Sequence, residues 1–232
     1  TELNRNRIIA MMAAILLREH PGTTIVTDSI TSTGLAAFIR KHGGVHHRFK
    51  RGYRNVINES MRLNREGHDS QLAMETSGHG ALKENYFLDD GAYLVTRLLI
   101  ELARAKKEGY TLESLIADLA EPAESKEFRM NILVPDFKAY GQKIIDELNV
   151  YAASQPGWSV APNNFEGVRV NLDKAHGDGW FLLRLSLHDP LIPLNIESDS
   201  VGGVRQIAAE LAPFLRPFDQ LDTSALLAFA GC

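Results

Sequence analysis

Short strand-like runs alternate with helix-like stretches through the first half of the chain, and this alternation limits the folds it can form. Residues 23–28 form a β-branched run typical of a buried strand. Further strands are predicted at 45–50 and 71–74, and helices at 4–20, 35–42, 55–65, from residue 90 or 91 onward, and at 111–120. This order favours a three-layer α/β domain with a mainly parallel sheet.

The second half of the chain has a different order of elements. A strand at 128–133 and a helix at 136–154 come first. Four short strands follow at 158–160, 167–172, 180–186 and 191–197, and a closing helix runs from residue 200 or 203 to 215. We expect Pro213 to end or kink that helix. This layout predicts a smaller α+β domain, in which helices cover one face of an antiparallel sheet.

A polar stretch lies between the two halves. Residues 121–127 contain Pro122 and show no apolar period, so they are interpreted as a linker. The predicted domains are therefore residues 1–120 and 121–232.

The composition excludes several classes of protein. The chain has 232 residues and a formal net charge of -4, which argues against a nucleic-acid partner. The apolar run 8–17 is too short to span a membrane. Cys232 is the single cysteine, so no disulfide and no cysteine-based metal site can form within one chain. A reducing, cytoplasmic compartment fits this composition. Thr1 in place of Met indicates either processing or a fragment of a longer protein.

Polar side chains occupy alternate positions after the strand at 71–74. Glu75, Ser77 and His79 would form one row if the backbone stayed extended, while Gly78 and Gly80 would leave the other side bare. The Glu75 carboxylate can accept hydrogen bonds from two adjacent hydroxyls, which suits a polyol. The alternative is an ordinary polar loop.

In that alternative, Glu75 forms an ion pair with Lys83. Residues 28–29, 51–52 and 75–77 all follow predicted strands. Ligands of parallel sheets bind at the carboxyl ends of strands, so these groups are expected to converge on one edge.

The segment Glu75-Thr76-Ser77-Gly78-His79, with Lys83 and Asp89-Asp90-Gly91 after it, resembles the sugar-binding loop of the α-D-phosphohexomutases. The resemblance implies that Glu75 and Ser77 hold sugar hydroxyls and that His79 and Lys83 belong to the same pocket.

A second segment of the first half, Lys50 to Tyr53, resembles a family loop that faces the sugar phosphate. Gly52 matches the family pattern there, and Tyr53 replaces the usual histidine.

A second chemical stretch, Arg184 to Pro190, lies between two predicted strands. Arg184 offers a bidentate fork and Ser186 a hydroxyl, and both suit a phosphate. Alternatively, Arg184 pairs with Glu197 or Asp189.

This stretch resembles the phosphohexomutase phosphate-binding loop at Arg184, Ser186 and Pro190. Leu187 and His188 replace the family's small and hydroxylated pair, so His188 would donate to phosphate with a pH-dependent charge.

Two parts that the family needs for phosphoryl transfer are absent from the sequence. Neither the phosphorylated-serine segment nor the Asp-rich Mg²⁺ loop occurs, so no catalytic residue and no metal ligand is predicted here.

The resemblance therefore implies the third and fourth domains of a phosphohexomutase, an isomerase that interconverts hexose 1-phosphate and hexose 6-phosphate. Its partners would be the hexose phosphate and the missing N-terminal domains, its cofactor Mg²⁺ in the full-length enzyme, and the fragment alone would be inactive. The alternatives are a non-catalytic phosphosugar-binding or regulatory module, and a domain pair that binds nothing.

Overall fold

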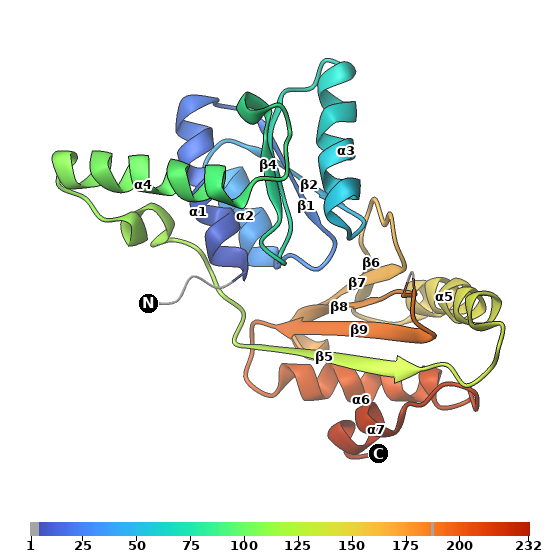
Figure 1. Ribbon diagram of the computed structural model, residues 1–232. Coiled ribbons are helices and arrows are strands. Elements are labelled where there is room, and N and C mark those ends of the chain that lie inside the picture. The colour runs from blue at the N-terminus through green and yellow to red at the C-terminus, as the bar shows by residue number, and fades with distance from the viewer. Residues whose placement is uncertain (1–4, 187) are drawn as a thin grey trace. The chain divides into compact units, whose positions relative to one another are not determined.

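The computed structural model describes residues 5–186 and 188–232, and these form two compact units (Figure 1). The first unit is Thr1–Glu121 and the second is Pro122–Cys232. Each unit has its own sheet and its own hydrophobic core.

The first unit is built on a four-stranded mixed sheet in the order β2-β1-β3-β4. Its strands are β1 (Thr24–Asp28), β2 (Val45–Phe49), β3 (Ser70–Met74) and β4 (Gly80–Leu82). β1 pairs with β2 and β3 in parallel, and β4 pairs with β3 in the antiparallel direction. The mainly parallel sheet is confirmed. β4 was not predicted, because a three-residue strand with a glycine gives almost no periodic signal.

Helices cover both faces of this sheet. Successive side chains of a strand point to opposite faces, so neighbouring residues of one strand pack against different helices. Ile25 and Leu72 pack in the cluster that includes α1 (Arg5–Glu19), α2 (Thr33–Lys41) and α4 (Gly91–Glu108). Val26 packs on the other face with α3 (Tyr53–Arg65) (Figure 1). The three-layer prediction is therefore confirmed.

The ends of these elements follow local signals in the sequence. The Asp90 side chain caps α4 by accepting from the Tyr93 N–H at 3.0 Å, and Gly109 ends the helix in the left-handed conformation. Short 3₁₀ helices lie at η1 (Lys83–Asn85) and η2 (Leu112–Ile116). The latter is shorter than the predicted helix at 111–120.

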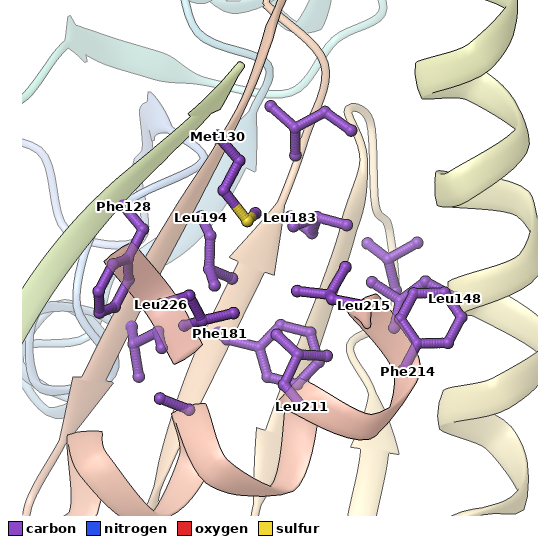
Figure 2. Packing of buried hydrophobic residues seen from close by; sticks show 14 of the residues in the cluster. Phe128, Met130, Leu148, Phe181, Leu183, Leu194, Leu211, Phe214, Leu215 and Leu226 are labelled. Carbon is purple, nitrogen blue, oxygen red and sulfur yellow. The ribbon is translucent and has the colours of Figure 1, made fainter. Parts of the chain in front are cut away.

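The second unit is an antiparallel sheet of five strands in the order β5-β9-β8-β7-β6. The strands are β5 (Glu124–Asn131), β6 (Trp158–Val160), β7 (Val168–Leu172), β8 (Gly179–Leu183) and β9 (Leu191–Ser198). The helices are α5 (Phe137–Ser154), α6 (Gly203–Leu215) and α7 (Ser224–Ala230), and a 3₁₀ turn, η3, spans Lys174–His176. Figure 2 shows Phe181 and Leu194 of the sheet packed with Leu211 and Leu215 of α6. The α+β prediction is confirmed.

Several predicted boundaries in this unit are wrong. Glu124 to Glu127 were expected in a linker, but they pair with Ser198 to Asn195 as the first half of β5. The outer side chains of this edge strand are polar, which hid its period of two. β8 ends at Leu183 rather than at 186. α7 was not predicted, and α6 continues to Leu215 past Pro213.

Candidate functional site

The carboxyl edge of the first unit's sheet gathers the polar groups that follow its parallel strands. Asp28 ends β1, and its Oδ2 accepts from Thr76 Oγ1 at 2.6 Å. Arg51, which follows β2, places its Nε 3.5 Å from the same oxygen. The next residue, Gly52, donates its N–H to Glu75 Oε1 at 2.7 Å. The structure therefore brings Asp28, Gly52 and Glu75 together at one edge.

The segment from Glu75 to His79 is a turn, so the predicted extended row is wrong. The Gly78 N–H donates to the Glu75 carbonyl at 3.0 Å, and the Glu75 N–H donates to the His79 carbonyl at 2.8 Å. Gly78 has φ +98°, which a glycine adopts at little cost. The turn still keeps the predicted pair in contact, because Ser77 Oγ donates to Glu75 Oε2 at 3.1 Å.

The Glu75 carboxylate is thus held at both oxygens and is nearly buried, with 5% exposure. The predicted alternative partner, Lys83, pairs with Asp69 instead, with Nζ 2.7 Å from Oδ1. β4 reverses the chain direction, so Lys83 lies at the opposite end of β3 from Glu75. The structure does not bring Lys83 to the Glu75 cluster.

Tyr53 and His79 form an exposed ledge beside this carboxylate. Their rings stack with centroids 5.1 Å apart and planes inclined by 24°. His79 Nδ1 lies 2.8 Å from Asp89 Oδ2, and Asp89 Oδ1 accepts from the Gly80 N–H at 3.2 Å. These contacts tie the first turn of α3 to the loop after β3.

Asp28 is a buried member of this cluster, which the sequence analysis placed at this edge of the sheet but gave no binding role. It is fully buried, and its Oδ1 accepts no hydrogen bond from any residue that the structure describes. Burial raises the pKa of Asp28 to about 6, although Thr76 and Arg51 oppose the shift. The signal in the sequence was its place at the end of a β-branched run, which put residues 28–29 at the carboxyl edge of the predicted sheet.

The raised pKa predicts that protonated Asp28 stabilises the first unit at acidic pH. The folded state holds this proton more tightly than the unfolded state. The contribution is therefore complete below the unfolded pKa near 4 and is lost as the pH rises through about 6. We expect the protection of β1 amides in hydrogen exchange to fall across this window by on the order of 2–3 kcal/mol. Asp28→Asn should remove this dependence.

The matched control for this prediction is Asp69→Asn. Although burial alone would raise the pKa of Asp69, hydrogen bonds from Lys83, Thr23 and Gln71 hold it below its usual value. Its contribution is therefore lost as the pH falls, with the opposite sign. A pH dependence that is the same in wild type and Asp28→Asn would contradict the assignment.

In the second unit, the loop after β8 carries the predicted phosphate-binding residues. The half-buried Arg184 donates its backbone N–H to the Pro193 carbonyl at 3.2 Å. The Ser186 N–H donates to the Leu191 carbonyl at 3.0 Å, and Ser186 Oγ accepts from the Asp189 N–H at 3.3 Å.

Two further predicted positions belong to this loop, and the structure describes one of them. His188 is exposed, and Leu187 lies outside the described residues. The structure thus places Arg184, Ser186 and His188 in one short connection between β8 and β9.

The alternative partners of Arg184 have other contacts. Glu197 lies opposite Trp180, at the far end of β8 from Arg184, and accepts from its indole N–H at 3.0 Å. Asp189 Oδ2 lies 4.0 Å from Arg129 Nη2. The strand register therefore separates Arg184 from Glu197.

Two kinds of feature are absent from the described residues. Within 5–186 and 188–232, no three His, Cys, Asp or Glu side chains lie close enough together to hold a metal ion. No helix in the same part of the chain combines the length and the apolar character that a membrane crossing requires.

A three-layer α/β unit followed by an antiparallel α+β unit is the architecture of the class that the resemblance implies, the α-D-phosphohexomutases. Residues 4–122 match the family described as "Phosphoglucomutase/phosphomannomutase, alpha/beta/alpha domain III". The chain belongs to the phosphoglucomutase/phosphomannomutase family, and it corresponds to a C-terminal portion of its members.

Three relatives illustrate the similarity. The phosphomannomutase/phosphoglucomutase of Pseudomonas putida is 31% identical over 204 residues, which are 87% of this chain and 40% of the relative. The phosphoglucosamine mutase of Symbiobacterium thermophilum is 27% identical over 203 residues, 84% of this chain and 37% of the relative.

The crystal structure of a family protein from Burkholderia thailandensis superposes with a TM-score of 0.74 at 27% identity, over 95% of this chain and 43% of that one. The chain thus spans about 40% of the length of the curated relatives that it matches.

Proposed function

We propose that this chain supplies the hexose-binding and phosphate-binding parts of an enzyme that interconverts hexose 1-phosphate and hexose 6-phosphate. Its relatives are named as mutases of glucose, mannose and glucosamine phosphates. Family membership supports the reaction class, an isomerisation by phosphoryl transfer. The assignment of the sugar to the first unit and of the phosphate to the second rests on the side chains of each unit.

The observation that carries the proposal is the fixed, nearly buried carboxylate of Glu75. A carboxylate offers about four lone-pair positions, and the Gly52 N–H and the Ser77 hydroxyl use two of them. Two adjacent sugar hydroxyls would fill the others. Since both protein donors are in place before the ligand arrives, binding costs little rearrangement. The Tyr53–His79 ledge beside Glu75 offers a flat surface for the ring.

The phosphate ester is assigned to the loop after β8 in the second unit. Arg184 supplies a planar donor fork, Ser186 a hydroxyl, and exposed His188 a further donor when protonated. A phosphate held away from the reacting centre supplies positioning energy and does not itself react. The same phosphate-binding loop must then accept both the 1-phospho and the 6-phospho sugar.

The nucleophile and the metal are assigned to the part of the relatives that this chain does not match. Mg²⁺ in such an enzyme neutralises charge on the transferring phosphoryl group. Glu75, Ser77, Arg184 and Ser186 contribute orientation of the substrate. The cytoplasm remains the predicted compartment.

Calorimetric titration of the 232-residue chain tests this proposal. We expect glucose 6-phosphate, mannose 6-phosphate and glucose 1-phosphate to bind with Kd on the order of 0.1–1 mM. Free glucose and inorganic phosphate should each bind at least about tenfold more weakly, because each fills only one of the two grips. The isolated chain should show no mutase turnover. Equal affinity for inorganic phosphate and hexose phosphate would reject the sugar assignment.

A further inference from the structure

A buried side-chain contact joins the turn that carries Glu75 to the end of β1. Thr76 Oγ1 donates to Asp28 Oδ2 at 2.6 Å, and Thr76 is only 5% exposed while Asp28 is fully buried. Thr76 stands between Glu75 and Ser77, the two residues assigned to the sugar hydroxyls. Any displacement of Thr76 therefore displaces both of them.

Asp28 is itself held in place by neighbouring segments. Thr31 Oγ1 donates to the Asp28 carbonyl at 3.1 Å, and Arg48 of β2 donates its Nε–H to Thr31 Oγ1 at 3.1 Å. Arg51 Nε lies 3.5 Å from the carboxylate oxygen that Thr76 also contacts. Since β1 is the strand between β2 and β3, this carboxylate is a fixed point of the sheet edge to which the turn after β3 is attached.

The backbone hydrogen bonds of the turn determine its shape but not its position on the sheet edge. They join Glu75 to Gly78 and to His79, so they lie within the turn itself. The contact between His79 and Asp89 leaves the turn on its exposed side, where water competes for the same groups. The buried contact with the end of β1 has no such competition, so it constrains the position of the turn more strongly.

We propose that Asp28 is a positioning residue of the sugar site: through Thr76 it sets the place of the Glu75 carboxylate and thereby the affinity for the hexose. This inference rests on the proposed function, in which Glu75 accepts from two sugar hydroxyls. Asp28 is fully buried, so it acts on the sugar through Glu75 and not by contact. Such an acceptor must be held within about 0.5 Å of its productive place, so a looser turn lowers the affinity.

Calorimetric titration of three variants tests the proposal. Thr76→Val keeps nearly the same side-chain shape and removes the donor, so glucose 6-phosphate should bind about tenfold more weakly. Thr76→Ser keeps the hydroxyl and should restore most of the affinity. Ser60→Ala is the matched control, because it removes another buried hydroxyl contact, Ser60 Oγ to Ser70 Oγ at 2.6 Å, where β3 begins. It should lose comparable stability and leave the affinity unchanged.

Two further readouts separate positioning from a merely structural role. In the Glu75→Gln background, Thr76→Val should cause no further loss of hexose affinity, because its effect passes through the Glu75 carboxylate. NMR titration reaches the weak affinities that this comparison needs. Binding of inorganic phosphate should not change in Thr76→Val, since the loop after β8 is assigned to the phosphate. The proposal is overturned if Thr76→Val binds glucose 6-phosphate as tightly as Ser60→Ala does, or loses equally with Glu75 and with glutamine at that position.

Hydrogen exchange of the ligand-free chain tests the positioning separately from the proposed function. The Gly52 N–H donates to Glu75 Oε1 from the loop after β2, so it should exchange at least about fivefold faster in Thr76→Val than in Ser60→Ala. If wild type does not bind glucose 6-phosphate while Gly52 exchanges as expected, the sugar assignment fails and the positioning of Glu75 by Asp28 is upheld. If Gly52 exchanges equally in the two variants, Asp28 does not position the carboxylate.

Discussion

Replacing Glu75 by glutamine should weaken the binding of glucose 6-phosphate by roughly 10–100-fold, which corresponds to a loss of about 1.5–3 kcal/mol for hydrogen bonds to a charged group. The amide keeps the shape of the side chain. However, its NH₂ group must then face either the Gly52 N–H or the Ser77 hydroxyl, both of which now donate to the carboxylate. One sugar hydroxyl also loses its acceptor.

Calorimetric titration measures this loss directly. Glu113→Gln is the matched control, because Glu113 is an exposed glutamate of the same unit and lies in η2, away from the sheet edge. Circular dichroism should show that both variants melt close to wild type. If Glu75→Gln binds glucose 6-phosphate as well as Glu113→Gln does, Glu75 does not hold the sugar.

The Glu75 segment shows which features of the site could be predicted from the sequence and which could not. Its place after β3 could be predicted, because residues 71–74 follow a helix-like stretch in the alternation of strands and helices. The structure shows that β3 (Ser70–Met74) is indeed a strand, buried on both faces. The shape of the segment that follows could not. Glu75, Ser77 and His79 alternate in sequence as an extended row would, yet Gly78 turns the chain back at φ +98°. The backbone hydrogen bonds of this turn determine the conformation of the segment, and the alternation of polar residues does not.

The reversal also explains why Lys83 was misassigned. In the sequence it is eight residues from Glu75, within reach of an ion pair across a loop. Once β4 runs antiparallel to β3, each residue beyond the turn moves away from Glu75, and Lys83 arrives beside Asp69. The ion-pair partner of Lys83 depends on the direction of β4, and the sequence of a three-residue strand does not predict its direction.

The polar side chains of the edge strand β5 caused the second error in the predicted elements. The outer side chains of β5 are Ser125, Glu127 and Arg129, so its first half had the composition of a linker. Its membership in the sheet rests on backbone pairing with β9, which leaves no mark on the side chains. Where burial is two-sided, as in β1, the prediction was sound.

Replacing Arg184 by alanine should reduce hexose phosphate affinity by about 100-fold, since a bidentate Arg–phosphate contact is among the stronger hydrogen-bonded pairs. Arg184→Lys keeps the charge but loses the planar fork, so we expect an intermediate loss of about tenfold. Affinity for unphosphorylated glucose should not change in either variant. Rising salt should weaken wild type more than Arg184→Ala, because salt screens the lost charge interaction.

The control for this series is Arg216→Ala, an exposed arginine after α6 in the same unit. Its removal lowers the net charge equally but leaves the loop after β8 intact. Because Arg184 belongs to the second unit and Glu75 to the first, their separate losses identify which part of the ligand each unit holds. Glu75→Gln should spare the weak binding of inorganic phosphate, and Arg184→Ala should abolish it. If Arg184→Ala and Arg216→Ala weaken phosphate binding equally, the contact is general electrostatic attraction, and the loop after β8 is not the phosphate site.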